Sequence, residues 1–157
     1  MNTIAKRSPS CGFTLIEILI VIGIIAILAA IVLVAVNPAE QFKNANDAQR
    51  SSNVNAIINA VGQYTVDQKG ALPAGIPTGA ANAKFIADSG TDICSLLVPR
   101  FLPALPADPK KADQSITEDE CGAGDTYDTG YKIYADGDRV TVVAPDTETG
   151  PDITVTR

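Results

Sequence analysis

The 157-residue chain is 46% hydrophobic and carries 12 basic and 18 acidic side chains, a formal net charge of −6. Because an acidic surface repels phosphate backbones, we expect no direct binding to nucleic acid. The chain has no histidine, and it contains neither a dinucleotide-binding glycine motif nor a phosphate loop, so we expect no enzymatic activity.

The N-terminal third contains one long apolar run, residues 13–36, in which Glu17 is the only ionisable side chain. At about 1.5 Å per residue, a helix of this length spans about 36 Å, enough to cross a hydrocarbon core of about 30 Å. A carboxylate in such a segment costs about 2.5–3.5 kcal/mol at the centre and less near an end, so we expect Glu17 to have a partner.

The flanks of this run favour some roles over others. Lys6 and Arg7 precede it, as in a secretory signal, but the 19 apolar residues from 18 to 36 exceed the usual 7–15 and no small-residue cleavage site follows. An uncleaved signal-anchor fits the length and leaves Glu17 unexplained. The two basic residues place the N-terminus in the cytoplasm and everything after residue 36 outside.

The junction Gly12-Phe13-Thr14-Leu15-Ile16-Glu17, followed directly by the apolar run, resembles the class III leader junction of type IV pilins and pseudopilins. This resemblance implies that prepilin peptidase removes residues 1–12 by cutting between Gly12 and Phe13, and then N-methylates Phe13. It also ties Glu17 to methylation and to assembly with identical or related subunits. After cleavage, side chains contribute a net charge of −8, since 10 basic and 18 acidic residues remain.

Beyond the apolar run, residues 37–69 are predicted to form the amphipathic half of a long helix. Asn37-Pro38 either interrupts that helix or begins a new segment. Gly70, with Pro73 close behind, predicts its end. The predicted apolar face comprises Phe42, Ala45, Val54, Ile57, Ile58, Val61 and Tyr64. The residues placed elsewhere around the helix are Asn44, Asp47, Arg50, Asn53 and Asp67.

Residues 70–157 are predicted to form a small extracytoplasmic domain. A turn-rich loop covers residues 70–81, and Asp92 is expected to cap a short helix that ends near Val98 because Pro99 follows. The proline-rich residues 101–109 predict an extended connector similar to the Leu-Pro-x-Asp-Pro segment of many pilin domains. Residues 110–128 are predicted to be an acidic loop.

The last part of the chain predicts strands. Residues 131–134 and 139–143 flank the turn Ala135-Asp136-Gly137-Asp138, and residues 152–156 offer a third strand. A lone hairpin is marginally stable, so we expect this sheet to pack on the helix face that carries Ile57, Ile58 and Val61. The predicted fold is therefore α+β and type IV pilin-like, with a long N-terminal helix packed on a small antiparallel sheet.

Two further features concern stability and ligands. Outside the cytoplasm, Cys94 and Cys121 can form a disulfide worth roughly 3.5 kcal/mol in the chain-entropy model, although two unpaired thiols in the core remain an alternative. Without histidine, two cysteines do not complete a zinc shell, so we expect no such metal site. Acidic residues raise calcium as an alternative to solvated loops, although their spacing matches no EF-hand. They are Glu118, Asp119, Glu120, Asp125, Asp128, Asp136 and Asp138.

The favoured hypothesis is a structural subunit of a type IV pilus-like filament, held in the cytoplasmic membrane and then polymerised through its first helix. Gly23, Ala26, Ala29 and Ala30 would let neighbouring helices approach closely, or are simply membrane filler. Glu17 would pair with the amine that cleavage exposes on Phe13, in its own or a neighbouring subunit. The alternatives are a pseudopilin of a type II secretion or competence apparatus, and a monomeric signal-anchored surface binding module.

Overall fold

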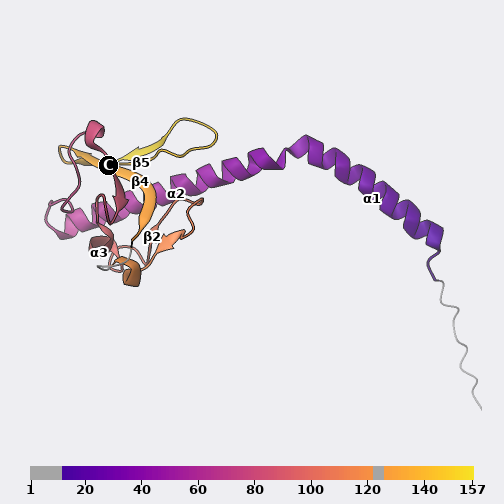
Figure 1. The fold of residues 1–157 in the computed structure, drawn as a ribbon, viewed down its shortest axis with the longest axis horizontal. Helices are drawn as coiled ribbons and strands as arrows, with labels where there is room; N and C mark the ends of the chain where they lie inside the picture. The colour runs from indigo at the N-terminus through magenta and orange to yellow at the C-terminus, as the bar shows by residue number, and fades with distance from the viewer. Residues whose placement is uncertain (1–11, 122–125) are drawn as a thin grey trace, which may run out of the picture. The chain divides into compact units, whose positions relative to one another are not determined.

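The computed structural model describes residues 12–121 and 126–157 (Figure 1). The chain divides into two compact units, of which the first ends at Gln41 and the second runs from Phe42 to Arg157. The first unit contains helix α1, Leu15–Val36. Every side chain described in α1 is exposed to solvent. The predicted apolar helix is therefore confirmed, and it is apolar on all sides.

Helix α1 ends at Asn37, which adopts the left-handed conformation with φ 44° and ψ 77°. Asparagine tolerates this region better than most residues do. Helix α2, Pro38–Asp67, begins at the next residue, where the missing N–H of proline costs nothing. The Asn37 carbonyl accepts the N–H groups of Glu40 and Gln41 at 3.1 and 3.4 Å. The apolar and amphipathic halves are therefore two helices, and Asn37 is the residue that separates them.

Helix α2 ends close to the position predicted from Gly70. Lys69 and Gly70 both have positive φ, 56° and 100°. The N–H of Gly70 donates to the Thr65 carbonyl at 2.8 Å, and that of Lys69 donates to the Val66 carbonyl at 3.2 Å. This pair of bonds is a Schellman motif, which satisfies carbonyls that the helix end would leave unpaired.

The main sheet of the second unit has four antiparallel strands in the order β1-β4-β5-β6. Their bounds are β1 Lys84–Ala87, β4 Asp128–Asp136, β5 Arg139–Ala144 and β6 Ile153–Thr156. A smaller sheet pairs β2, Leu105–Pro106, with β3, Ser115–Ile116. The remaining elements are short helices: η1 Ala80–Asn82, α3 Cys94–Leu97 and η2 Glu118–Cys121.

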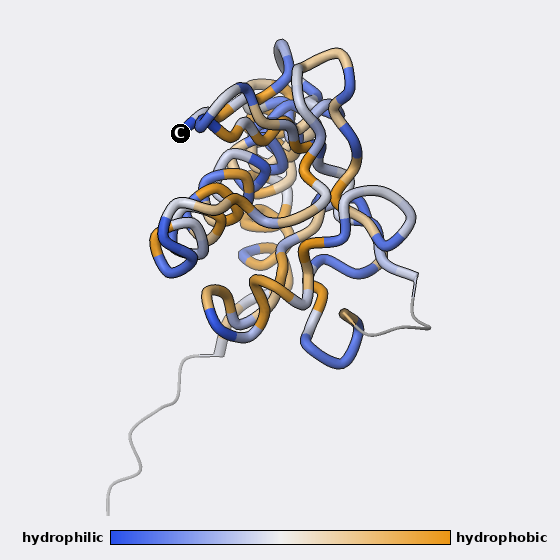
Figure 2. The backbone as a smooth tube through the Cα atoms, turned by 90° about the vertical axis from the view of Figure 1, so that its left-hand side faces the viewer, coloured by the Kyte–Doolittle hydropathy of each residue, from blue (hydrophilic) through white to orange (hydrophobic). Residues whose placement is uncertain are grey.

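Helix α2 packs its apolar face against the main sheet. Ile57, Ile58 and Val61 are at most 2% exposed and share one core with Tyr131, Ile133 and Val142 from the sheet. In Figure 2, the loops that project from the molecule are mostly hydrophilic. The predicted packing of sheet on helix is confirmed.

Strand β1 was not predicted, so the main sheet has four strands where three were expected. It is only four residues long and follows a loop rich in glycine and proline, and its pairing partner β4 lies more than 40 residues later in the chain. Thr129 Oγ1 donates to the Ile86 carbonyl at 2.9 Å, which fixes this pairing. Long-range pairing of this kind leaves no local sequence signal.

The hairpin between β4 and β5 is tighter than predicted. Asp136 pairs with Arg139, so the turn contains only Gly137 and Asp138. Gly137 has φ +62°, as the first position of a two-residue type II′ turn requires. The predicted four-residue turn was wrong because the strands continue to the last residues that can pair.

Two loop predictions also need correction. Residues 110–128 were expected to be loop throughout, but they contain β3 and η2, and Asp128 begins β4. Asp92 does not sit at the N-cap of α3, which is Ile93. Its carboxylate nevertheless accepts the Cys94 N–H at 3.3 Å from one residue further out. The helix ends at Leu97, as the proline at position 99 predicts.

Candidate functional site

The predicted processing and assembly residues lie together at the start of α1. Gly12, Phe13 and Thr14 are outside the helix and exposed, with the Phe13 side chain 80% exposed. Thr14 is the N-cap, with extended backbone angles of φ −82° and ψ 151°. Its Oγ1 accepts the Glu17 N–H at 3.2 Å. The bond between Gly12 and Phe13 is therefore accessible, and Glu17 lies in the first helical turn after it.

Helix α1 presents a continuous apolar surface. The large hydrophobic side chains described in residues 15–34 are between 46% and 86% exposed, and a Cβ added at Gly23 would meet nothing within 4 Å. In the part of the chain that the structure describes, Leu15–Ala35 is the one helix long and apolar enough to span a membrane. A helix that is hydrophobic all round needs lipid or other helices around it. The surface suits both membrane insertion and helix–helix assembly.

The second unit contains a buried ionic cluster that the sequence did not predict, centred on Arg50. The Arg50 side chain is fully buried. Its Nε and Nη2 donate to the two carboxylate oxygens of Asp108 at 2.6 and 3.0 Å, a bidentate geometry that favours arginine over lysine. Hydrogen bonding to Asp108 raises the pKa of Arg50 above its already high usual value. The pair fastens α2 to the segment between β2 and β3.

The loop between β5 and β6 is bound to the same cluster. Arg50 Nη1 contacts Asp47 and Glu148 at 2.8 and 3.3 Å. Asp47 accepts the backbone N–H groups of Glu148 and Thr149 and the Thr149 hydroxyl, the last at 2.6 Å. Lys110 Nζ lies 3.0 Å from the Glu148 carboxylate. One guanidinium thus organises three chain segments that are distant in sequence.

Neighbouring polar groups complete the cluster. Asn53 Nδ2 donates to the Ala107 carbonyl at 2.8 Å and to the Tyr131 hydroxyl at 3.0 Å. Burial is the main cause that raises the pKa of Tyr131 to about 12. Gly130 has φ +78° and lies close to Asp108, so a Cβ added at position 130 would be 3.1 Å from the Asp108 Cβ. Position 130 therefore favours glycine for its backbone angle, and any larger residue would also have to displace the Asp108 side chain slightly.

The prediction that Arg50 and Asn53 lie away from the apolar face was wrong, because both side chains are buried on that face with hydrogen-bond partners. Arg50 is four residues before Val54 and seven before Ile57, so all three share one helix face. A charge on that face needs a buried partner of opposite sign. Asp108, within the proline-rich connector, was the residue in the sequence that could have indicated such a partner for Arg50.

Phe42 was predicted on the apolar face and is 71% exposed. The first residues of α2 that lose exposure are Asn46 and Asp47, which hold the loop that contains Glu148. The packed domain therefore starts along α2 about one turn beyond Phe42. Periodicity alone does not reveal where along a helix its packing begins.

The ionic cluster makes acid stability a testable property. Burial raises the pKa of Asp47, but hydrogen bonds from Thr149, the Glu148 backbone and Arg50 outweigh this effect and lower it to about 2. A carboxyl whose folded pKa is depressed stabilises the fold above its unfolded pKa of about 3.9, and this contribution is lost as the pH falls towards the folded value. We therefore expect the Asp47→Asn variant to be less stable than wild type at pH 6, with the difference shrinking between pH 4 and pH 2.

The measurement is urea unfolding of the detergent-solubilised full chain, followed by near-ultraviolet circular dichroism. This signal comes from the folded second unit, because the chain has no tryptophan and its tyrosines are at positions 64, 127, 131 and 134. The exposed Asp152 provides a matched control, Asp152→Asn, which should behave as wild type at every pH. A stability difference for Asp47→Asn that is constant from pH 6 to pH 2 would contradict the assignment.

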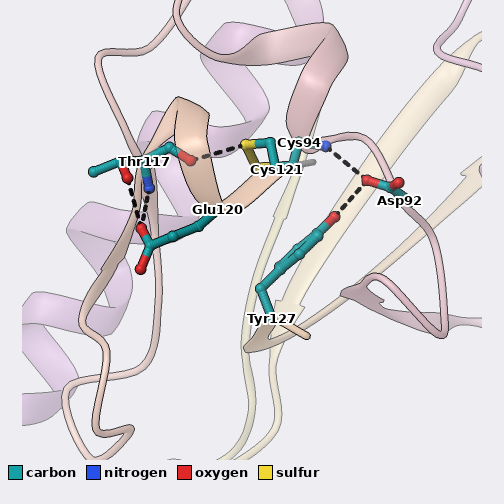
Figure 3. Close-up of a disulfide and its surroundings, with 6 residues drawn as sticks. All are labelled: Asp92, Cys94, Thr117, Glu120, Cys121 and Tyr127. Carbon is teal, nitrogen blue, oxygen red and sulfur yellow. Dashed lines mark hydrogen bonds between the residues drawn. A yellow bond between two sulfur atoms is a disulfide. The ribbon is translucent and has the colours of Figure 1, made fainter. Parts of the chain in front are cut away.

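Cys94 and Cys121 form a disulfide that joins α3 to η2 (Figure 3). Asp92 accepts both the Cys94 N–H and the Tyr127 hydroxyl, the latter at 2.8 Å. On the other side, the Glu120 carboxylate accepts the N–H and the hydroxyl of Thr117 at 2.6 and 2.7 Å. These backbone and hydroxyl bonds lower the pKa of Glu120. The disulfide therefore joins two short segments that are each held by their own local hydrogen bonds.

Among the described residues, the acidic side chains considered for calcium do not form a metal site. Asp128 forms an ion pair with Lys111 at 2.5 Å, and Glu120 is bonded to Thr117. Asp125 lies outside the described residues. Across residues 12–121 and 126–157, no group of three or more His, Cys, Asp or Glu side chains could hold a metal ion.

Comparison with known proteins identifies the N-terminal segment. Residues 7–33 match the family model of the prokaryotic N-terminal methylation motif. No curated protein and no solved structure matches the chain. The matched residues include the Gly12–Phe13 bond, Glu17 and most of α1, and they lead into an α+β domain with a four-stranded antiparallel sheet. The chain carries the N-terminal signature of type IV pilins and pseudopilins.

Proposed function

We propose that the chain is a structural subunit of a type IV pilus-like filament. In this proposal, prepilin peptidase cuts between Gly12 and Phe13, the new N-terminus is methylated, and the mature chain polymerises through α1. The observation that carries it is an apolar helix, exposed on all sides, that begins at Leu15, only two residues after the cut, and has one carboxylate, Glu17, in its first turn.

The chemistry of assembly follows from charge and dielectric. Cleavage leaves Phe13 with a cationic amine close to Glu17, and the carboxylate can pair with the amine of its own or of a neighbouring subunit. Two charges 4 Å apart attract by roughly 4 kcal/mol at an effective dielectric of 20, compared with about 1 in water. Desolvation consumes part of this gain, so the pair fixes the register between subunits more than it adds affinity.

Before assembly, α1 would anchor the subunit as a single-pass protein of the cytoplasmic membrane, with the second unit outside. A helix satisfies its backbone hydrogen bonds internally, so it can move from lipid into a filament core without exposing polar groups. The oxidising conditions outside the cytoplasm suit the disulfide between Cys94 and Cys121. In this role the chain has no catalytic site; prepilin peptidase, the membrane and other subunits are its partners.

A pseudopilin of a type II secretion or competence apparatus is the alternative within the same class, since the N-terminal chemistry is the same. A monomeric surface module anchored by α1 is the alternative outside it. Cleavage and polymerisation separate the second alternative from the proposal, because an anchored monomer needs neither.

The test is electron microscopy of material sheared from cells that express the full chain together with prepilin peptidase, with an antibody against the second unit. We expect labelled filaments in these cells and none in cells that lack the peptidase. Membranes that hold abundant processed protein, without any labelled filament at the surface or in the periplasm, would refute the proposal.

A further inference from the structure

Thr14 makes two hydrogen bonds that fix where α1 begins. Its side-chain oxygen accepts the Glu17 N–H at 3.2 Å, and its carbonyl accepts the Ile18 N–H at 3.3 Å. The residue itself keeps extended backbone angles. Leu15 is therefore the first helical residue, and two non-helical residues, Phe13 and Thr14, separate the helix from the Gly12–Phe13 bond.

The side-chain bond matters because of what would replace it. Without the Thr14 hydroxyl, the nearest helical acceptor for the Glu17 N–H is the Phe13 carbonyl, four residues back. That bond would wind Thr14 into the helix. One further step would pair the Ile16 N–H with the Gly12 carbonyl, the acyl group of the bond to be cut. An unpaired N–H costs more in lipid than in water, so a helix start near a membrane favours such winding.

We propose that Thr14 is a positioning residue for leader removal. By capping α1 so that the helix begins at Leu15, Thr14 keeps the Gly12–Phe13 bond outside the helix and exposed. Proteases cut preferentially at exposed, non-helical peptide bonds of this kind. This inference rests on the proposed function. In the cleavage itself, water adds to the Gly12 carbonyl and the C–N bond breaks. Gly12 leaves as a carboxylate, and the Phe13 nitrogen takes a proton to become an amine.

The family-model match supports treating the cap and the cut as parts of one segment. The methylation-motif match covers residues 7–33 and so includes the cut, the cap and the helix that the cap starts. Phe13 contributes no packing that could hold the junction open, since it is 80% exposed. Within the described residues, the Thr14 side chain is the group whose hydrogen bond separates the cut from the helix.

The experiment compares four substitutions in the full chain, co-expressed with prepilin peptidase, by the fraction cleaved at early times in membrane extracts. Thr14→Ser and Thr14→Asn keep an oxygen that can cap, whereas Thr14→Val keeps the shape without the acceptor and Thr14→Ala keeps neither. Thr14→Ser and Thr14→Asn should be cleaved at a rate within about twofold of wild type. Thr14→Val and Thr14→Ala should be cleaved about fivefold more slowly, which corresponds to the free energy that a typical N-cap contributes to a helix.

Thr65→Val serves as the control, since the Thr65 hydroxyl bonds within α2 to the Val61 carbonyl and lies far along the chain from the cut. It should be cleaved as wild type is. A rapidly cleaved Thr14→Val chain, or a slow Thr14→Ser or Thr14→Asn chain, would overturn the inference, because the peptidase would then read side-chain shape and not the cap. A wild-type chain that stays uncleaved would instead refute the proposed function.

Discussion

Changing Glu17 to alanine should abolish filament formation while leaving the protein in the membrane. Glu17 is the one ionisable side chain between residues 13 and 36, and in the proposal its carboxylate receives the Phe13 amine of a neighbouring subunit. Its removal relieves a cost of up to about 2.5–3.5 kcal/mol for membrane insertion, so the variant should insert at least as well as wild type. The measurement pairs immunoblots of membranes with electron microscopy of sheared material.

Glu17→Gln separates charge from size. Glutamine has nearly the same shape and can still accept a hydrogen bond, but it does not form an ion pair with an amine. We expect Glu17→Gln to lose filaments as Glu17→Ala does. If Glu17→Gln cells carry filaments in normal number, then the ion pair is not what drives assembly. If Glu17→Ala cells do so, Glu17 has no assembly role.

Changing Arg50 to methionine is expected to destabilise the second unit by about 3–5 kcal/mol, the usual cost of removing one partner from a buried ion pair. The reason is the group left behind: the Asp108 side chain is only 5% exposed and would lose both of its bonds to the guanidinium. The loop bearing Glu148 would lose its contact with Arg50 as well. Urea unfolding of the detergent-solubilised full chain, followed by tyrosine circular dichroism, measures this effect.

Arg100→Met is the matched control, because Arg100 forms a single ion pair with Asp67 on the surface, where the two side chains are 65% and 32% exposed. Such pairs contribute about 0–1 kcal/mol. In addition, the double variant Arg50→Met/Asp108→Asn should recover part of the loss, since it no longer leaves an unpaired carboxylate at position 108. Equal losses for Arg50→Met and Arg100→Met would show that burial of the cluster contributes nothing to stability.

The sequence predicted those parts of the fold whose signals are local. The apolar run specified α1, the glycine at position 70 marked the end of α2, and the alternation in residues 131–143 specified the hairpin. In each case the controlling interaction lies within a few residues, so periodicity and turn chemistry were sufficient. Whether the helix is interrupted at Asn37-Pro38 was left open by the sequence.

What the sequence did not predict depends on contacts between distant segments. Strand β1 exists because β4 pairs with it, and Arg50 can be buried because Asp108 and Glu148, 58 and 98 residues later, neutralise it. Propensity assigns an arginine to the surface, and the signals for burial were the spacing of Arg50 from Val54 and Ile57 and the presence of Asp108 as a possible partner. At the N-terminus, Gly12, Phe13 and Glu17 could be named from the sequence because they lie within one six-residue motif, and their roles in cleavage, methylation and assembly stay predictions. The one residue missed there was Thr14, whose capping role requires the helix start to be known.

The proposed assembly requires the precursor to be cut before Phe13, so that a cationic amine faces Glu17. The most direct measurement is the intact mass, with N-terminal sequence, of the protein extracted from membranes of its own cells. We expect a chain that begins at Phe13, with one methyl group on the Phe13 nitrogen and one disulfide. A protein that retains residues 1–12 in cells with an active prepilin peptidase would contradict it.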